Sequence, residues 1–350
     1  MNLVGITAFP FSGKSTVINL LLKRDNNLKS ENEGRITVPD ERIEILSQIF
    51  EPLKKTPAFI SIKELSAFDM RKKVESSLIN DLKNSDVIAF VARSFDVSLY
   101  PYIYPDVDPK RDIRKFLDEL IIEDIAIAEK RIRTGTKGLK KSSQEEREIE
   151  ILKKVLPILE EGKLFRDIDL SNEELICLKH YAFLTLKPFL LLLNISEADL
   201  SNTLQIEDDF TNYLGNNTKV LALSAKLEEE LSLLEADEAR EILSSYGLEN
   251  FGLERFIRAC YDLLGYMTFF TVGKDEVRAW QIRKGSNALE AAGRIHSDIA
   301  RGFIRAEVIS YQDFIDSGSM NEAKKRGLLR LEGKEYMVKD GDILHVRFNI

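Results

Sequence analysis

The sequence has few of the residues that build disulfides and metal sites, and it has no long apolar run. Its 350 residues include two cysteines, Cys177 and Cys260, and three scattered histidines. The cysteines lack a C-x-x-C or zinc-ligand spacing, so we expect reduced thiols. The strongest apolar run, PFLLLLNI, is far shorter than a membrane span and predicts a buried strand. With no basic-then-apolar leader either, we expect a cytoplasmic protein without a membrane segment.

Length and charge set the next limits. A chain of 350 residues is too long for one ordinary core and predicts two or three domains. The net charge of −8 argues against a protein that is coated all over by nucleic acid. From Thr268 to the end, however, 14 Lys and Arg exceed 12 Asp and Glu. This basic C-terminal part is a weak indication of an RNA-facing module, and ordinary surface variation explains it equally well.

Five apolar runs predict a parallel α/β sheet that is covered by helices on both faces. In chain order they are LVGITAF, AFISIKEL, SDVIAFVARSF, KPFLLLLNIS and TKVLALSAK. Between the third and fourth runs, DIRKFLDELIIEDIAIAEKRIR and EEREIEILKKVLPILEEG carry apolar residues at helical spacing. The polar loop TGTKGLKKSSQ joins them. They predict an antiparallel helical hairpin that is inserted into the α/β domain and has an apolar packing seam.

The pattern changes again from about Met267, where a small mixed α+β domain is predicted. FFTVGKDEVRAWQIRKG and KEYMVKDGDILHVRFNI are each interpreted as a pair of strands, with KDGD as the turn of the second pair. Between them, NALEAAGRIHSDIARGF predicts a short helical piece.

The segment VGITAFPFSGKSTVINLL places a Gly-Lys-Ser loop between a strand and a helix, as a phosphate-binding loop requires. In such a loop Lys14 would reach the β- and γ-phosphates and Ser15 would hold Mg²⁺. The first glycine of G-x-x-x-x-G-K-[ST] is missing, and Ala8 in its place costs on the order of 1 kcal/mol if that position needs a positive φ. The alternative is a helix start without a ligand. The predicted phosphate contacts are Ala8, Phe11, Ser12, Gly13, Lys14, Ser15 and Thr16.

Two later strands end in residues that would face the base of a nucleotide. LNISEADL and LSAK take the positions of N-K-x-D and S-A-K in P-loop GTPase-like folds. Here the first motif is N-x-x-E, and a glutamate in place of the guanine-pairing aspartate predicts a loss of guanine discrimination. The predicted residues at the base end are Asn194, Glu197, Ser224, Ala225 and Lys226.

With these motifs in place, the sequence resembles the YchF family of Obg-like ATPases. The run from FFTVGKDEVRAWQIRKG to DGDILHVRFN resembles that family's TGS domain, and TVPDERIEIL, DPKRDI, LNISE and AKLEEEL fit its middle parts. The resemblance implies a P-loop G domain in 1–107 and 180–266, a helical insertion in 108–179 and a β-grasp TGS domain in 267–350. It also implies ATP preferred over GTP, Mg²⁺ and association with the ribosome.

Several positions depart from the family's pattern in the nucleotide-handling parts. Within the loop, Ala8 and Phe11 replace a glycine and an asparagine, and Leu28 falls where the family has its switch-I threonine. A leucine ligates no metal ion and senses no γ-phosphate. The family's proposed catalytic histidine falls on Tyr102, whose unperturbed pKa near 10 makes it a poor base at neutral pH.

The family's D-x-x-G motif falls on Glu64-Leu65-Ser66-Ala67. Glu64 retains a carboxylate that can accept from a metal-bound water, so Ser15 and Glu64 are the predicted metal-site residues. Ala67 lacks the backbone freedom with which a glycine turns its N–H toward a γ-phosphate. Because phosphoryl transfer needs a positioned metal and an oriented water, binding is more secure than hydrolysis, and no catalytic residue is assigned.

Three functions remain open at this point. The favoured one is a nucleotide-binding, ribosome-associated protein whose hydrolysis is weak or lost. The alternatives are an active ATPase or GTPase of the family, and an RNA or ribosome adaptor with a vestigial P-loop. We expect a monomer that uses its TGS and helical surfaces for ribosome or RNA contact. The basic residues expected to contribute to that contact are Lys274, Arg278, Arg283, Lys284, Arg294, Arg301 and Arg305.

Overall fold

The computed structural model describes residues 3–23, 28–30, 33–69, 74–96, 102–135 and 142–349. Contacts within the chain divide it into two compact units, Met1–Arg35 with Ser61–Phe256 and Ile36–Ile60 with Ile257–Ile350. Within the described ranges, no helix combines the length and the apolar character of a bilayer-spanning segment.

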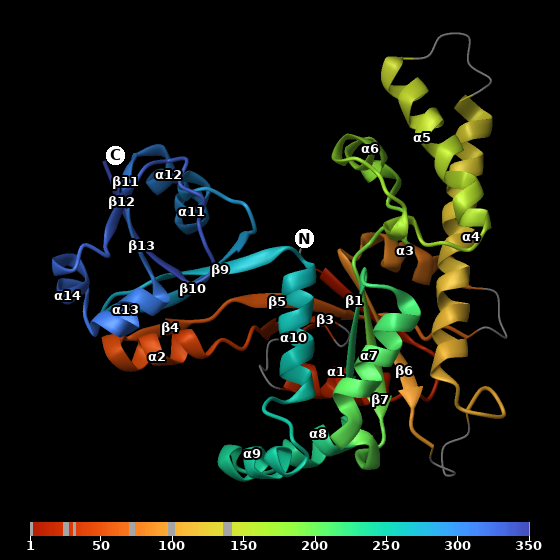
Figure 1. The fold of residues 1–350 in the computed structure, drawn as a ribbon, viewed down its shortest axis with the longest axis horizontal. Coiled ribbons are helices and arrows are strands. Elements are labelled where there is room, and N and C mark those ends of the chain that lie inside the picture. The colour runs from red at the N-terminus through yellow and green to blue at the C-terminus, as the bar shows by residue number, and fades with distance from the viewer. Residues whose placement is uncertain are drawn as a thin grey trace. The chain divides into compact units, whose positions relative to one another are not determined.

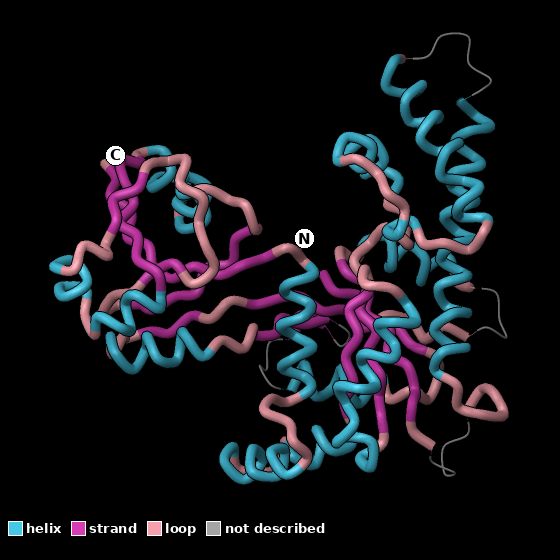
Figure 2. Tube along the Cα trace, in the orientation of Figure 1, coloured by secondary structure: helices cyan, strands magenta, loops and turns pink. Residues whose placement is uncertain are grey.

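The first unit is built on a seven-stranded sheet in the order β2-β3-β5-β1-β6-β7-β8 (Figure 1). Its strands are β1 (Leu3–Ala8), β2 (Leu28–Ser30), β3 (Glu33–Thr37), β5 (Phe59–Glu64), β6 (Val87–Ser94), β7 (Phe189–Ile195) and β8 (Thr218–Leu223). Strands β5, β1, β6, β7 and β8 pair in parallel, and the tube in Figure 2 shows them side by side. They are the five predicted apolar runs. The β2–β3 hairpin was not predicted.

Both faces of the central strands are buried, which explains why the strands appear in the sequence as continuous apolar runs. On β7, Leu191 and Leu193 join a core with residues of α3 and α4, whereas Leu190 and Leu192 point to the opposite face and are equally buried. The helices of this unit are α1 (Lys14–Lys23), α3 (Ser76–Asn84), α4 (Pro109–Gly135), α5 (Ser143–Glu160), α6 (Asn172–Leu178), α7 (Thr203–Leu214), α8 (Ala225–Leu231), α9 (Ala236–Ser245) and the first part of α10 (Gly252–Leu263). The described residues of this unit also form the 3₁₀ turns η1 (Phe165–Asp167), η2 (Lys179–Tyr181) and η3 (Glu197–Asn202).

Helices α4 and α5 form the predicted hairpin, and α5 packs against part of the longer α4 (Figure 1). A capping box between Ser142 and Glu145 starts α5. The fully buried carboxylate of Asp124 in α4 accepts hydrogen bonds from the N–H groups of Leu184 (2.7 Å) and Thr185 (2.8 Å) and from the Thr185 hydroxyl (2.7 Å). This cluster fixes α4 to the segment that leads into β7.

The second unit contains a six-stranded sheet in the order β12-β11-β13-β9-β10-β4. Its strands are β4 (Lys54–Thr56), β9 (Tyr266–Thr271), β10 (Glu276–Arg283), β11 (Phe303–Ser310), β12 (Arg330–Glu332) and β13 (Asp342–Phe348). Its helices are α2 (Glu41–Phe50), α11 (Ala288–Ile295), α12 (Ser297–Arg301), α13 (Tyr311–Ser317) and α14 (Met320–Lys325). Ala291 and Ala292 of α11 pack against Phe269 and Ala306 of the sheet, and the rings of Phe50 and Phe314 stack with their centroids 5.5 Å apart.

Two expectations differ from this arrangement. The predicted domain boundary lies at residue 267, whereas the second unit begins at Ile257 and also includes residues 36–60, because β4 pairs in parallel with β10. The segment KEYMVKD was interpreted as a strand next to β13, and this is wrong. Strand β13 pairs with β11 and β9 instead, and Met337 makes one isolated bridge to Asn287.

Candidate functional site

The Gly-Lys-Ser loop connects β1 to α1 at the carboxyl ends of the parallel strands, where open α/β sheets bind their ligands. The first turn of α1 closes with a hydrogen bond from Val17 N to Gly13 O of 3.1 Å. Gly13 has φ +86°, and an ideal Cβ there would lie 2.2 Å from Nδ2 of Asn194. The backbone angle therefore favours glycine at this position, and a Cβ would also displace the amide of Asn194.

Ala8 replaces the missing glycine without the expected conformational cost. It is the last residue of β1 and is fully buried, and the positive φ occurs three residues later, at Phe11 (+63°). A left-handed backbone costs a non-glycine residue roughly 1–2 kcal/mol. The Phe11 ring is 54% exposed. The strain in this loop therefore lies at Phe11, where the sequence analysis did not expect it.

Phe9, the other phenylalanine of the loop, is a core residue. Its ring contacts those of Phe68, Phe90 and Tyr104, at centroid distances of 5.7, 5.5 and 6.2 Å. Phe90 in turn stacks on Phe116 of α4 at 4.4 Å. Aromatic packing thus anchors the start of the loop to the sheet and to α4.

Asn194 joins three of the predicted motifs. Its Nδ2 donates to Ser12 O (3.0 Å), and its Oδ1 accepts from the N–H of Ala225 (3.0 Å). The side chain is 5% exposed. The structure therefore brings the phosphate-type loop, the N-x-x-E motif and the S-A-K motif together. The buried Ser12 hydroxyl has no hydrogen-bond partner in the structure.

Arg93, at the end of β6, is a site residue that the sequence analysis missed. Its Nη1 donates to Phe11 O (3.3 Å) and its Nε to Phe95 O (3.0 Å). The guanidinium lies over the rings of Phe95 (4.6 Å) and Tyr102 (5.1 Å), and the side chain is only 1% exposed. The available signal was a single charge at the carboxyl end of an otherwise apolar strand.

Lys14 and Glu64 form an ion pair. The Lys14 ammonium also donates to Leu65 O (2.8 Å). Ser15 is exposed and Thr16 is partly buried at the start of α1. The described residues contain no group of three or more His, Cys, Asp or Glu side chains placed to hold a metal ion. Of the two predicted metal-site residues, Ser15 therefore faces solvent, whereas the carboxylate of Glu64 is paired with Lys14.

At the base end, Glu197 accepts a hydrogen bond from the hydroxyl of Tyr246, which raises the pKa of that tyrosine. Ser224 caps α8 by accepting from Leu227 N (3.4 Å). Lys226 is exposed and lies 3.7 Å from Glu230. The charged members of this group are therefore on the surface, and Asn194 and Ser224 are buried.

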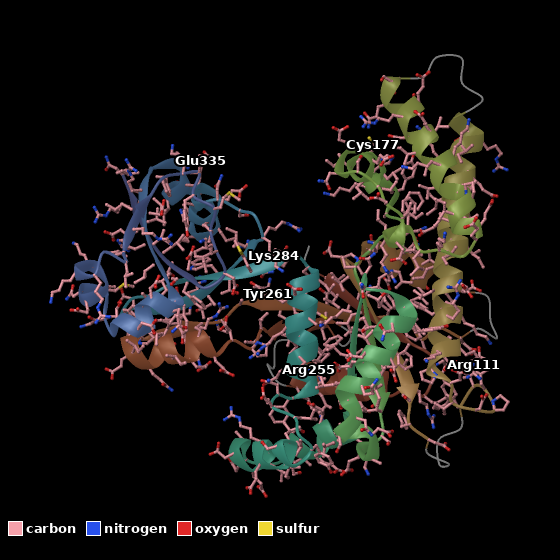
Figure 3. The ribbon with its side chains drawn as sticks, viewed as in Figure 1. Arg111, Cys177, Arg255, Tyr261, Lys284 and Glu335 are labelled. Atoms are coloured by element: carbon pink, nitrogen blue, oxygen red, sulfur yellow. The ribbon has the colours of Figure 1, made fainter. Side chains whose placement is uncertain are left out.

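Tyr102 donates a hydrogen bond to the fully buried carboxylate of Asp112 in α4. Burial, together with this bond, raises the pKa of Tyr102 well above its ordinary value of 10. Burial also raises the pKa of Asp112. Arg111, labelled in Figure 3, donates to the other oxygen of Asp112 (3.0 Å) and lies over the ring of Tyr104 (4.2 Å). A phenol held protonated in this way is no general base near neutral pH.

The segment after β5 continues along the end of β1. Leu65 N donates to Ile6 O (2.9 Å) and Phe68 N to Ala8 O (2.8 Å). Ala67, between them, is exposed. Leu28 lies in β2, and its side chain is outside the described part of the structure.

Comparisons with known proteins cover the whole chain. A family model named YchF-GTPase_C, described as "Protein of unknown function (DUF933)", matches residues 266–349. The "Ribosome-binding ATPase YchF" of Bacillus subtilis (strain 168) is 35% identical over 361 residues, which cover 99% of each chain. Its counterpart in Haemophilus influenzae is 36% identical over 358 residues with the same coverage. A solved structure, "Structure of the Schizosaccharomyces pombe YchF GTPase", matches with TM-score 0.87 and 29% identity, over 99% of this chain and 98% of that chain.

Proposed function

The chain belongs to the YchF family, and on that premise we propose that it is a ribosome-associated protein that binds ATP in preference to GTP, together with Mg²⁺, and hydrolyses it weakly or not at all. The observation that carries this proposal is the double hydrogen bond of Asn194. It connects the loop that would hold the phosphates to the motif that would hold the base.

The loop residues fit a bound triphosphate. Gly13 leaves no room for a side chain, the backbone turns left-handed at Phe11 and Gly13, and the N-terminus of α1 follows directly. Such a backbone presents N–H groups to an anion. Lys14 would exchange its bond to Glu64 for the phosphates, and the exposed hydroxyl of Ser15 would hold Mg²⁺. The metal ion would supply compensation of the phosphate charge.

The base end supports a preference for ATP over GTP. In this proposal Asn194, Glu197, Ser224, Ala225 and Lys226 surround the base. Glu197 carries its carboxylate one methylene farther from the backbone than an aspartate would, and it is hydrogen-bonded to Tyr246. It is therefore not free to pair with the two donors on the edge of guanine, and the discrimination in favour of guanine is lost.

Three features weaken hydrolysis while leaving binding intact. Tyr102 keeps its proton and donates a hydrogen bond to Asp112, so it cannot accept a proton from an attacking water. Leu28, at the position of the family's switch-I threonine, has no side-chain oxygen for a metal ion or a γ-phosphate. Ala67 lacks the backbone freedom of a glycine at the position that would turn toward a γ-phosphate. In this proposal the protein therefore acts by binding the nucleotide and not by hydrolysing it.

For the C-terminal part, a TGS domain within residues 266–349 would contribute to contact with ribosomal RNA. The two bacterial relatives carry "ribosome-binding" in their names. Of the basic residues expected to participate, Lys284 pairs with Asp262, Arg301 pairs with Asp298, and Arg278 lies 3.8 Å over the ring of Trp280. The contact would therefore depend most on those for which the described residues show no ion pair, such as Arg305. We propose that the protein acts as a monomer in the cytoplasm.

Calorimetric titration with non-hydrolysable analogues of ATP and GTP, each with and without Mg²⁺, tests the nucleotide site. The proposal expects ATP to bind at least as tightly as GTP and Mg²⁺ to strengthen both. GTP bound tenfold more tightly would reverse the preference, and no binding of either would leave an adaptor with a vestigial loop. Co-sedimentation with ribosomes at two salt concentrations tests the partner, because a contact with phosphates must strengthen at low salt.

A further inference from the structure

We propose that Arg93 is a positioning residue that holds the phosphate-type loop in its anion-binding form and connects it to helix α4. This inference rests on the proposed nucleotide function and adds a residue that none of the predicted motifs contains. It starts from the burial of Arg93, which has one of the largest fully buried side chains in the described part of the chain. A guanidinium without water around it must be satisfied by specific partners.

The partners of Arg93 fix one peptide of the loop. Its Nη1 donates to Phe11 O at 3.3 Å. A peptide bond is planar and trans, so its C=O and the next N–H point in opposite directions. With the Phe11 carbonyl held on Arg93, the N–H of Ser12 is directed to the opposite side of the loop.

Asn194 acts on the next peptide in the same way. Its Nδ2 holds Ser12 O at 3.0 Å, so the N–H of Gly13 is directed away from Asn194. Two buried side chains, from the carboxyl ends of the adjacent strands β6 and β7, thus fix two successive peptides. Successive N–H groups fixed in this way form a concave binding site for an anion.

The hydrogen bond from Arg93 is important because its acceptor, Phe11, has an unfavourable backbone conformation. Phe11 adopts φ +63°, a conformation that phenylalanine rarely adopts without support from its surroundings. The hydrogen bond from Arg93 is such support. The guanidinium is itself held between the rings of Phe95 and Tyr102 and by the carbonyl of Phe95.

The same contacts lead to helix α4. Tyr102, whose ring flanks Arg93, donates its hydroxyl to Asp112 near the start of α4, and Arg111 holds the other carboxylate oxygen. A chain of direct contacts therefore runs from α4 through Asp112, Tyr102 and Arg93 to the carbonyl of Phe11. A displacement at the base of the helical hairpin would change the loop through these groups.

The test compares Arg93→Lys with a matched control, Arg166→Lys. Arg166 is partly buried and also lies over an aromatic ring, that of Phe189 at 5.0 Å. It contacts Thr185 and Thr218, at the amino-terminal ends of β7 and β8, and the loop is at the opposite ends of the strands. A lysine keeps the charge in both variants but cannot reproduce the geometry of the guanidinium.

The first measurement is hydrogen exchange of the nucleotide-free protein, which does not depend on the proposed function. We expect Arg93→Lys to accelerate at least tenfold the exchange of the Val17 amide, which donates to Gly13 O (3.1 Å), and to leave α9 unchanged. Arg166→Lys should leave the exchange of this amide within twofold of the wild type. Equal protection of the Val17 amide in Arg93→Lys and the wild type would overturn the proposal.

The second measurement is the affinity for a non-hydrolysable ATP analogue with Mg²⁺. We expect a loss of about tenfold in Arg93→Lys and less than twofold in Arg166→Lys, with recovery of most of the loss in Arg93→Lys combined with Phe11→Asn. Asparagine tolerates a positive φ, so it depends less on Arg93. An undiminished affinity of Arg93→Lys, or no recovery in the double variant, contradicts the positioning role. If the wild type binds no nucleotide, the proposed function fails and the exchange experiment alone decides on Arg93.

If Arg93→Lys does not fold, Tyr102→Leu takes its place. It removes the ring beside the guanidinium and the hydrogen bond to Asp112, and leaves Arg93 intact. We expect accelerated exchange of the Val17 amide, by threefold or more. Protection equal to that of the wild type would show that the loop is held without this network.

Discussion

The two sides of the loop between β1 and α1 differ in what holds them. On the side of the backbone, Arg93 and Asn194 hold two successive carbonyls, and Gly13 adopts a positive φ next to the Asn194 amide. On the side where hydrolysis would take place, Glu64 is paired with Lys14 and Tyr102 with Asp112. The geometry of the first side depends on the main chain of the loop. On the second side, the side chains that would take part in hydrolysis are bonded to other side chains of the protein.

From this difference we propose that nucleotide binding and phosphoryl transfer depend on separate groups. Backbone N–H groups bind phosphate whatever the side chains of the loop are, which is why a phenylalanine and an alanine are compatible with the loop. Hydrolysis needs an oriented water and a group that handles its proton. A protein that has changed only the second set of groups keeps the nucleotide and loses turnover.

The largest expected effect concerns the attachment of α4, on which both sides depend. Asp124→Asn places an amide where three donors point at a carboxylate, and an amide NH₂ group cannot accept from them. We expect the free energy of unfolding to fall by about 3 kcal/mol, measured by urea denaturation. Asp118→Asn is the control, because Asp118 is on the same helix, has a half-exposed carboxylate and pairs with Arg114. Equal losses in the two variants would contradict this account.

The contribution of Asp124 to the stability of the fold should depend on pH. Burial raises the pKa of Asp124 to about 6. A carboxyl whose pKa is higher in the folded protein than in the unfolded chain stabilises the fold fully below the unfolded value near 4, and this contribution is lost as the pH rises through about 6. The stability difference between wild type and Asp124→Asn should therefore grow by about 1 kcal/mol from pH 7 to pH 5. A constant difference would show that the pKa is not raised.

The next effect tests the binding side alone. Lys14→Ala removes the ammonium that would contact the phosphates, and a charge-assisted bond of this kind contributes about 1.5–3 kcal/mol. We expect the affinity for a non-hydrolysable ATP analogue to fall about hundredfold by calorimetry. Lys23→Ala, at the exposed end of the same helix, should bind like the wild type. Undiminished affinity of Lys14→Ala would place the nucleotide elsewhere.

The hydrolysis side is tested by Tyr102→His. An imidazole titrates near neutral pH and can accept a proton where the phenol cannot. Because Glu64 and Ala67 are unchanged, we expect phosphate release to rise only about tenfold, below the full effect of a general base. Tyr104→His, two residues along, should not raise it. If Tyr102→His releases phosphate no faster than the wild type, Tyr102 does not limit the reaction.

The smallest effect is expected at the base end. Glu197→Asp shortens the side chain and breaks its bond to Tyr246, which frees a carboxylate for guanine. The ratio of ATP to GTP affinity, measured by competition, should shift toward GTP by less than tenfold. Glu229→Asp on the exposed face of α8 serves as the control. A ratio that is the same in both variants would remove Glu197 from the base site.

Much of the fold could be predicted because its signals are local. Five continuous apolar runs and two helical stripes give the parallel strands and the hairpin. Strand β4 could not be predicted, because its partner β10 is about two hundred residues away in the sequence and no local pattern specifies such a pair. The wrong strand at KEYMVKD came from a turn rule that considers only neighbours in sequence, whereas β13 pairs with β11 and β9.

The candidate site was predictable where a motif names the residue, as at Gly13, Lys14 and Asn194. Arg93 was missed because no motif contains it and because its role depends on burial and on the carbonyl of Phe11. The left-handed conformation of Phe11 could not be predicted from the sequence either, because phenylalanine disfavours this conformation and only the surrounding contacts impose it.

A single-turnover experiment tests the central claim most directly. A limiting amount of ATP labelled at the γ-phosphate is mixed with excess protein and Mg²⁺, and bound nucleotide and released phosphate are followed in the same sample. We predict that most of the ATP is bound and remains intact for many minutes, and that Lys14→Ala retains none of it. Conversion of the bound ATP to ADP within a minute, absent in Lys14→Ala, would contradict the account and show a working ATPase.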